Sequence, residues 1–272
     1  MKKILLLLAA FLPTMMWAGD NDDFGTWLEL GAEKALPYNL EVGIGGGLRT
    51  KDNSSVMDRW DIGASLGYKA SKYLKLSAGY SLLMDYNEEK RSKEEYDEDD
   101  GSLIAYRLTP SSWPPRHRFY VDLSPSIKMW KWVRFSGRFR YQYTYKNART
   151  VERTDYERND QYTPEGMITT WDEDQSEKEY ESETRQVLRS RMKVELDKKR
   201  LDWKPFVSVE FHNNVGYRGD FNLDKIRTSV GTTYKINKHN DIGVAYVMTL
   251  DRMEGHPYQK MHAVSASYSF DF

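Results

Sequence analysis

Apolar and polar residues alternate along most of the chain with a period of two. Between residues 133 and 146, every second position is apolar or aromatic, as at Phe139 and Tyr143. The positions between them are basic or polar, as at Arg138 and Gln142. Because successive side chains of a β-strand point to opposite faces, this pattern predicts a strand with one apolar face and one charged face.

The same alternation recurs in eleven segments. Most of these are about 10–14 residues long, whereas an ordinary strand has about 5–6 and a tilted strand needs about 9–11 to cross a bilayer. The pattern therefore predicts membrane-spanning strands with an apolar face toward lipid. The segments are 24–34, 40–48, 59–69, 74–85, 118–127, 133–146, 188–196, 207–212, 226–236, 242–250 and 262–272.

The connections between these segments alternate in length. Short ones such as "KASKY" and "NKHN" alternate with long polar ones at residues 87–115, 146–183, 213–224 and 252–260. Short periplasmic turns and long extracellular loops are typical of outer-membrane barrels. We therefore predict an all-β fold, a transmembrane antiparallel up-and-down barrel. The alternative, a soluble sandwich or lipocalin-like barrel, would put its apolar faces inside and use shorter strands.

The number of segments conflicts with the even strand number of single-chain bacterial barrels. With the long loops outside and the C-terminus in the periplasm, the segment 24–34 would begin on the outside. Either one strand is missing from the count or this segment does not cross fully. We predict 12 strands, with 10 as the alternative.

The N-terminus has the layout of a secretory signal peptide. Two lysines precede an apolar run over residues 4–12, and a small residue, Ala18, follows. We expect cleavage of residues 1–18, which leaves 19–272 as a single barrel domain. A membrane-anchoring helix is the alternative, but the run is short and Pro13 interrupts it.

The C-terminus, "YSFDF", places aromatic residues at Tyr268, Phe270 and Phe272. It resembles the assembly signature of bacterial outer-membrane barrels, which implies recognition by the barrel-assembly machinery. The stretches "TWLELGAEKAL", "LEVGIGGGLRT", "HRFYVDLSP" and "VSASYSFDF" make the chain similar to an uncharacterised family, domain of unknown function 2490. This resemblance implies an outer-membrane barrel of a Gram-negative bacterium and supplies no activity.

Composition agrees with this interpretation. Charged residues make up 30% and aromatic residues 14% of the chain, and the mean hydropathy is −0.75. A low mean hydropathy is expected when only half of each strand is apolar. The net charge of −1 gives no basic field for nucleic acid. The absence of cysteine excludes disulfides, thiolate zinc sites and a cysteine nucleophile.

Candidate catalytic residues are scarce. The five histidines form no HExxH or HxH pattern. The nearest Ser/His pair, His262 with Ser265, falls on opposite faces of one strand because the two positions differ by an odd number. We therefore predict no covalent chemistry, no cofactor and no metal, and keep a membrane-embedded lipid hydrolase as an alternative.

Charged residues gather on the inward register of three consecutive segments, where they form a basic wall. They can form a paired network that closes the lumen or a path for anions, and both remain open. The acidic runs 88–100 and 172–183 can cover this wall or bind divalent cations at the lipopolysaccharide surface, but we expect them to be solvated and mobile. The lumen cluster comprises Arg118, Arg134, Arg138, Arg140, Arg189, Arg191, Lys193 and Glu195.

These features predict a small porin-like channel or binding barrel. An accessory subunit of an outer-membrane complex, with a protein partner, is an alternative. The expected surroundings are outer-membrane lipid and lipopolysaccharide.

Overall fold

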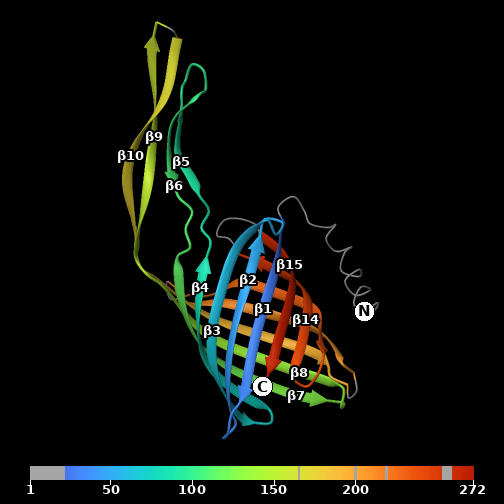
Figure 1. Cartoon of the computed structure of the whole chain (residues 1–272). Coiled ribbons are helices and arrows are strands. Elements are labelled where there is room, and N and C mark those ends of the chain that lie inside the picture. Colours follow the sequence, from blue (N-terminus) through green and yellow to red (C-terminus); the bar gives the residue numbers. More distant parts are fainter. Residues whose placement is uncertain (1–21, 165, 199–200, 218–219, 253–258) are drawn as a thin grey trace. The chain divides into compact units, whose positions relative to one another are not determined.

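The computed structural model describes residues 22–164, 166–198, 201–217, 220–252 and 259–272, so the predicted signal peptide lies outside the described residues. The chain forms two compact units. One is a closed β-barrel, and the other is a four-stranded sheet (Figure 1). The second unit combines residues 84–116 with residues 145–183, which contain the two stretches 87–115 and 146–183 predicted as long loops.

Eleven strands close the barrel, in the order β1-β15-β14-β13-β12-β11-β8-β7-β4-β3-β2. They coincide with the eleven segments in which the sequence alternates, which confirms those segments as strands. Their bounds are β1 (Asp23–Ala35), β2 (Leu40–Lys51), β3 (Val56–Ser71), β4 (Leu74–Asp85), β7 (Pro115–Met129), β8 (Val133–Lys146), β11 (Glu183–Leu196), β12 (Trp203–Tyr217), β13 (Asp220–Lys235), β14 (Asn240–Asp251) and β15 (Gln259–Asp271).

The barrel closes through one parallel pair of strands. β1 runs parallel to β15, from Asp23 opposite Met261 to Glu33 opposite Asp271, and antiparallel to β2 on its other side. Figure 1 shows β1 between these two strands. The predicted 12 strands, and the alternative of 10, are therefore wrong for the described residues. The even number assumes that all neighbours are antiparallel, whereas one parallel pair lets an odd number close into a ring.

The barrel is apolar on its outer face and polar on its inner face, which is the reverse of a soluble protein. Outward side chains are apolar and exposed, including Leu30 at 65% and Ile44 at 68%. Inward side chains are mostly polar, and several are buried, including Asp122 at 8% and Glu210 at 4%. Soluble barrels bury their apolar face instead, so this distribution argues against the lipocalin-like alternative and supports the predicted assignment of the two faces.

The inner wall combines long charged side chains with small residues that leave room for them. Gly79 is one such position, because a Cβ there would lie 2.4 Å from the Tyr120 ring. That ring lies under Arg140, whose guanidinium carbon is 3.8 Å from the ring centroid. A small apolar cluster of Trp27, Val247 and Ala263 is the only buried hydrophobic cluster among the described residues of the barrel interior.

The second unit has the strand order β10-β9-β6-β5. The Tyr106 ring stacks on Tyr156 with centroids 4.8 Å apart. Beside it, Arg107 donates two hydrogen bonds to Asp155, one from Nη2 to Oδ2 at 2.8 Å, which hold the pKa of Asp155 below its ordinary value. The strands are β5 (Lys90–Tyr96), β6 (Leu103–Thr109), β9 (Arg149–Thr163) and β10 (Gly166–Tyr180).

These strands correct the expectation that the acidic runs are mobile loops. Most of run 88–100 belongs to β5, and run 172–183 lies largely in β10. The side chains of β10 are almost all exposed. Because β10 carries acids on both faces, it lacks the apolar alternation that marks the barrel strands.

The described residues contain no helix that is long and apolar enough to span a membrane.

The parallel seam predicts a specific cross-link. Leu28 and Ala266 are directly opposite each other across β1 and β15, and neighbouring strands hold Cα atoms at a distance that a disulfide can bridge. Because the chain has no cysteine, the double variant L28C/A266C should form one intramolecular disulfide upon oxidation of the folded protein. Its formation is measured by gel mobility with and without reductant.

The matched control is L28C/F270C, whose second cysteine lies four residues, about 13 Å, further along β15. It should stay reduced under the same conditions. A twelfth strand between β1 and β15 would give the opposite result, with no cross-link in L28C/A266C.

Candidate functional site

The interior of the barrel contains a cavity of about 430 Å³ with a strong excess of basic side chains. Three acids also line it, namely Glu29, Asp61 and Glu210. A second cavity of about 390 Å³ shares Glu29, Arg49 and Asp61 with the first. The nine basic residues of the first cavity are Arg49, Arg59, Arg118, Arg138, Arg140, Arg189, Arg191, Lys193 and Arg227.

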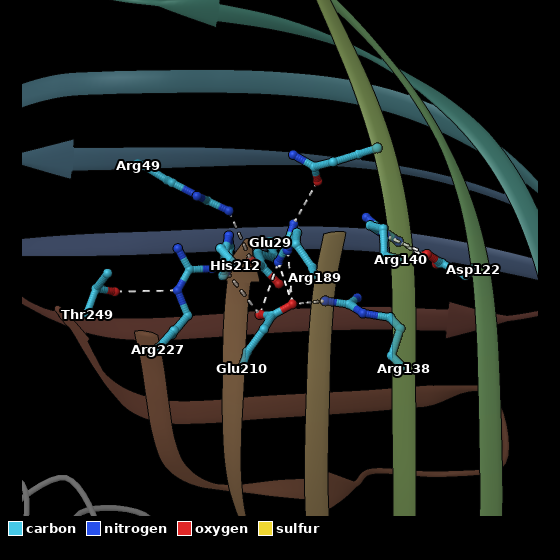
Figure 2. Close-up of polar contacts among 11 residues, drawn as sticks. Glu29, Arg49, Asp122, Arg138, Arg140, Arg189, Glu210, His212, Arg227 and Thr249 are labelled. Carbon is cyan, nitrogen blue, oxygen red and sulfur yellow. Dashed lines mark hydrogen bonds and ion pairs between the residues drawn. The ribbon is translucent and has the colours of Figure 1, made fainter. Parts of the chain in front are cut away.

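Glu210 on β12 is the most connected acid of this cavity (Figure 2). Its Oε1 accepts hydrogen bonds from Arg138 Nη2 at 2.9 Å and from Arg189 Nε at 3.0 Å. Arg189 Nη2 donates to Oε2 at 3.1 Å, and His212 Nε2 lies 3.8 Å from the same oxygen. One buried carboxylate therefore holds two arginines from the neighbouring strands β8 and β11.

Two further lining cations are paired with acids outside the cavity lining. Arg140 donates from Nε and Nη2 to the two oxygens of Asp122, both at 2.7 Å. Lys193 Nζ lies 2.5 Å from Glu195 Oε2. The bidentate geometry at Asp122 is the stronger arrangement of the two, because both guanidinium N–H groups are used at once.

Arg118, Arg191 and Arg227 have no carboxylate within ion-pair distance among the described residues. Arg118 Nε reaches only the hydroxyl of Thr144, at 3.3 Å. Arg227 Nε reaches Thr249 Oγ1 at 3.4 Å, and its guanidinium carbon lies 4.6 Å from the Trp27 ring centroid. The nine lining cations, the three lining acids, Asp122 and Glu195 together carry nine positive and five negative charges, a net excess of four positive charges.

Six of the eight residues predicted for the lumen cluster line this cavity, and Glu195 contacts one of them. Arg134 does not line it. Arg134 Nη2 lies 2.6 Å from Asp197 Oδ2, and Lys128 and Lys204 bind the same carboxylate at 2.9 and 3.3 Å. Arg134 therefore belongs to a separate paired cluster.

The predicted cluster omits Arg49, Arg59 and Arg227, which line the cavity from β2, β3 and β13. It also omits Trp27, on whose ring the Arg49 guanidinium carbon lies at 4.5 Å. The alternation already places all four on inward positions. The alternation does not predict the ring closure that brings these strands around one cavity.

His262 pairs with residues other than Ser265. Its Nδ1 contacts the Tyr246 hydroxyl at 2.5 Å, and its Nε2 lies 3.3 Å from Asp22 Oδ2. Ser265 instead lines the interior cavity.

The terminal aromatic residues lie on or next to β15. The rings of Phe270 and Phe272 meet edge to face with centroids 4.6 Å apart. The backbone N–H of Phe272 donates to the carbonyl oxygen of Glu33 at 2.9 Å. The last residue thus continues the pairing of β15 with β1.

Residues 24–259 match the family described as "Protein of unknown function (DUF2490)". The chain belongs to this family. The match includes the four-stranded sheet and the barrel strands except nearly all of β15, so Ser265 and Ser267 of the cavity lie beyond it.

No curated protein matches the chain. Among solved structures, it is similar to the translocator domain of the autotransporter NalP from Neisseria meningitidis. The two are 10% identical, with 96% of this chain and 92% of that chain covered and a TM-score of 0.33. At that TM-score, the similarity adds nothing to the description of the barrel.

Among the acids of the barrel interior, Glu210 should contribute most to the stability of the folded protein. In the variant Glu210→Gln, Arg138 and Arg189 lose their shared carboxylate, and removing one partner of a buried ion pair costs about 3–5 kcal/mol. Glu195→Gln is the control, because it removes an acid that pairs with one cation, Lys193, whereas Glu210 pairs with two, so its cost should be smaller. Urea unfolding of the protein refolded in lipid vesicles measures both. Equal unfolding midpoints for the two variants would refute the central role of Glu210.

Proposed function

We propose that the protein is an outer-membrane β-barrel whose interior admits small anions, as a narrow channel or a binding barrel, without covalent chemistry. The observation that carries this proposal is the cavity with nine basic and three acidic lining residues. A cationic interior enclosed by a low-dielectric wall attracts anions and repels cations.

The membrane location rests on the outer surface of the barrel. Its exposed side chains are apolar along the strands, as at Phe119, Val121 and Leu123 of β7. A closed ring of strands leaves no unpaired backbone edge, which is the condition for crossing a bilayer with strands. The signal-like N-terminus and the terminal Phe272 favour export to the outer membrane through the barrel-assembly machinery, with lipid and lipopolysaccharide around the barrel.

Both sequence-based hypotheses for the charged lumen contribute to this proposal. The pairs around Glu210, Asp122 and Asp197 form a structural network that stabilises the wall. Arg118 and Arg191 stand outside this network and supply the field that acts on anions. An anion path and a paired network therefore coexist in one interior.

An accessory role in a larger outer-membrane complex remains the second candidate. It is favoured by exposed apolar and aromatic side chains of the four-stranded sheet, such as Tyr162, Met167 and Ile168. A lipid hydrolase has less support, because His262 contacts Tyr246 and Asp22 and has no serine partner among the described residues.

Ion selectivity in planar bilayers tests the proposed function. The reversal potential under a KCl gradient should show preference for chloride over potassium. In R118E/R191E the preference for chloride should be lost, because replacing two cations with two anions cancels the excess of four positive charges around the cavity. The control K90E/K178E makes the same charge change on exposed positions of β5 and β10 and should leave the selectivity unchanged. Preference for potassium in the unmodified protein would contradict the proposal.

A further inference from the structure

We infer that the 430 Å³ cavity is a binding site for multivalent oxyanions, that is, for compact solutes with two or more phosphate or carboxylate groups. This inference deepens the proposed function and rests on it in one respect, since the solute must reach the interior. The volume falls in the range of about 300–1,000 Å³ that small-molecule sites occupy.

The strand register places two of the uncompensated cations on either side of Glu210. Arg191 is directly opposite Glu210 across β11 and β12, and Arg227 is directly opposite it across β12 and β13. Opposed Cα atoms in antiparallel strands are about 4.5–5.5 Å apart. The backbones of Arg191 and Arg227 are therefore about 10 Å apart, with the acid between them.

Glu210 makes no ion-pair contact with these two neighbours, because its oxygens bind Arg138 and Arg189. Arg118 lines the same cavity from β7, and it too lacks a carboxylate partner among the described residues. Like charges in an interior that excludes much of the bulk water repel each other strongly. A ligand with several negative groups relieves this repulsion at more than one arginine at once, which a single chloride ion cannot do.

The other lining groups favour oxyanions over halides. Guanidinium groups donate pairs of parallel hydrogen bonds that match phosphate and carboxylate oxygens. Five serines line the same cavity and add hydroxyl donors, and two of them, Ser208 and Ser229, are directly opposite each other on β12 and β13. The donor set is therefore that of a site for a hydrogen-bonded oxyanion. The five serines are Ser81, Ser208, Ser229, Ser265 and Ser267.

Isothermal titration calorimetry on the full mature chain, folded in a zwitterionic detergent, tests this inference. The probes are tripolyphosphate, citrate, orthophosphate and chloride. We expect one tripolyphosphate or citrate to bind per barrel, about tenfold or more tighter than orthophosphate, because more charge-assisted hydrogen bonds form. The affinity should fall steeply with added salt. The relative affinities of tripolyphosphate and citrate identify phosphate or carboxylate as the preferred group.

The variant R191Q/R227Q should weaken tripolyphosphate binding by about tenfold or more. The control K128Q/K204Q also removes two cations, from the separate Asp197 cluster outside the cavity lining, and leaves Arg134 on Asp197, so its affinity should be unchanged. Should the double variant fail to fold, the single variant R191Q should show a smaller loss in the same direction. Equal affinity for tripolyphosphate and orthophosphate, or equal losses in the two double variants, would overturn the site.

The two proposals fail in different ways. Chloride-selective conductance together with no binding of tripolyphosphate or citrate would overturn the oxyanion site and keep the anion channel. Tripolyphosphate binding that depends on Arg191 and Arg227, together with no conductance, would support the site and leave a binding barrel instead of an open channel.

Discussion

Closure of the sheet through the parallel β1–β15 pair is the interaction on which the rest of the structure depends. A wall of strands in a bilayer must pair every backbone edge, because lipid offers no hydrogen-bond partners. The β1–β15 register supplies that last edge. Closure also defines an inside, and it places Arg49 of β2 and Arg227 of β13 around the same cavity as Arg189 of β11.

The enclosed charges fall into two groups with different consequences. Pairs such as Arg140 with Asp122 lock neighbouring strands together, and Glu210 does the same for Arg138 and Arg189. These pairs stabilise the wall but attract little from solution. Arg191 and the other cations without a carboxylate partner are the side chains to which we assign the proposed anion recognition, so the proposal separates it from the pairs that stabilise the wall.

Much of the barrel can be predicted from the alternation in the sequence, because the apolar and polar positions of each strand identify its outer and inner faces, as Phe139 and Arg140 do on β8. The strand number cannot be predicted in this way, because the even-number rule assumes that all neighbouring strands are antiparallel, whereas β1 and β15 are parallel. The sheet of the second unit does not follow either, because β10 has acids on both faces. For the cavity, the sequence predicts that Arg191 points inward. Its distance from Arg227 cannot be predicted, because it depends on ring closure and on the β11–β12–β13 register.

The inverted polarity of the barrel is the central claim, and nitroxide scanning of β8 tests it most directly. Single cysteines at residues 138–143, in a chain with no cysteine of its own, are labelled and the protein is folded into lipid vesicles. Relaxation by oxygen, which concentrates in lipid, should peak at residues 139, 141 and 143. Relaxation by a water-soluble nickel complex should be low at those three positions. High nickel accessibility there, or no alternation with a period of two, would contradict the account.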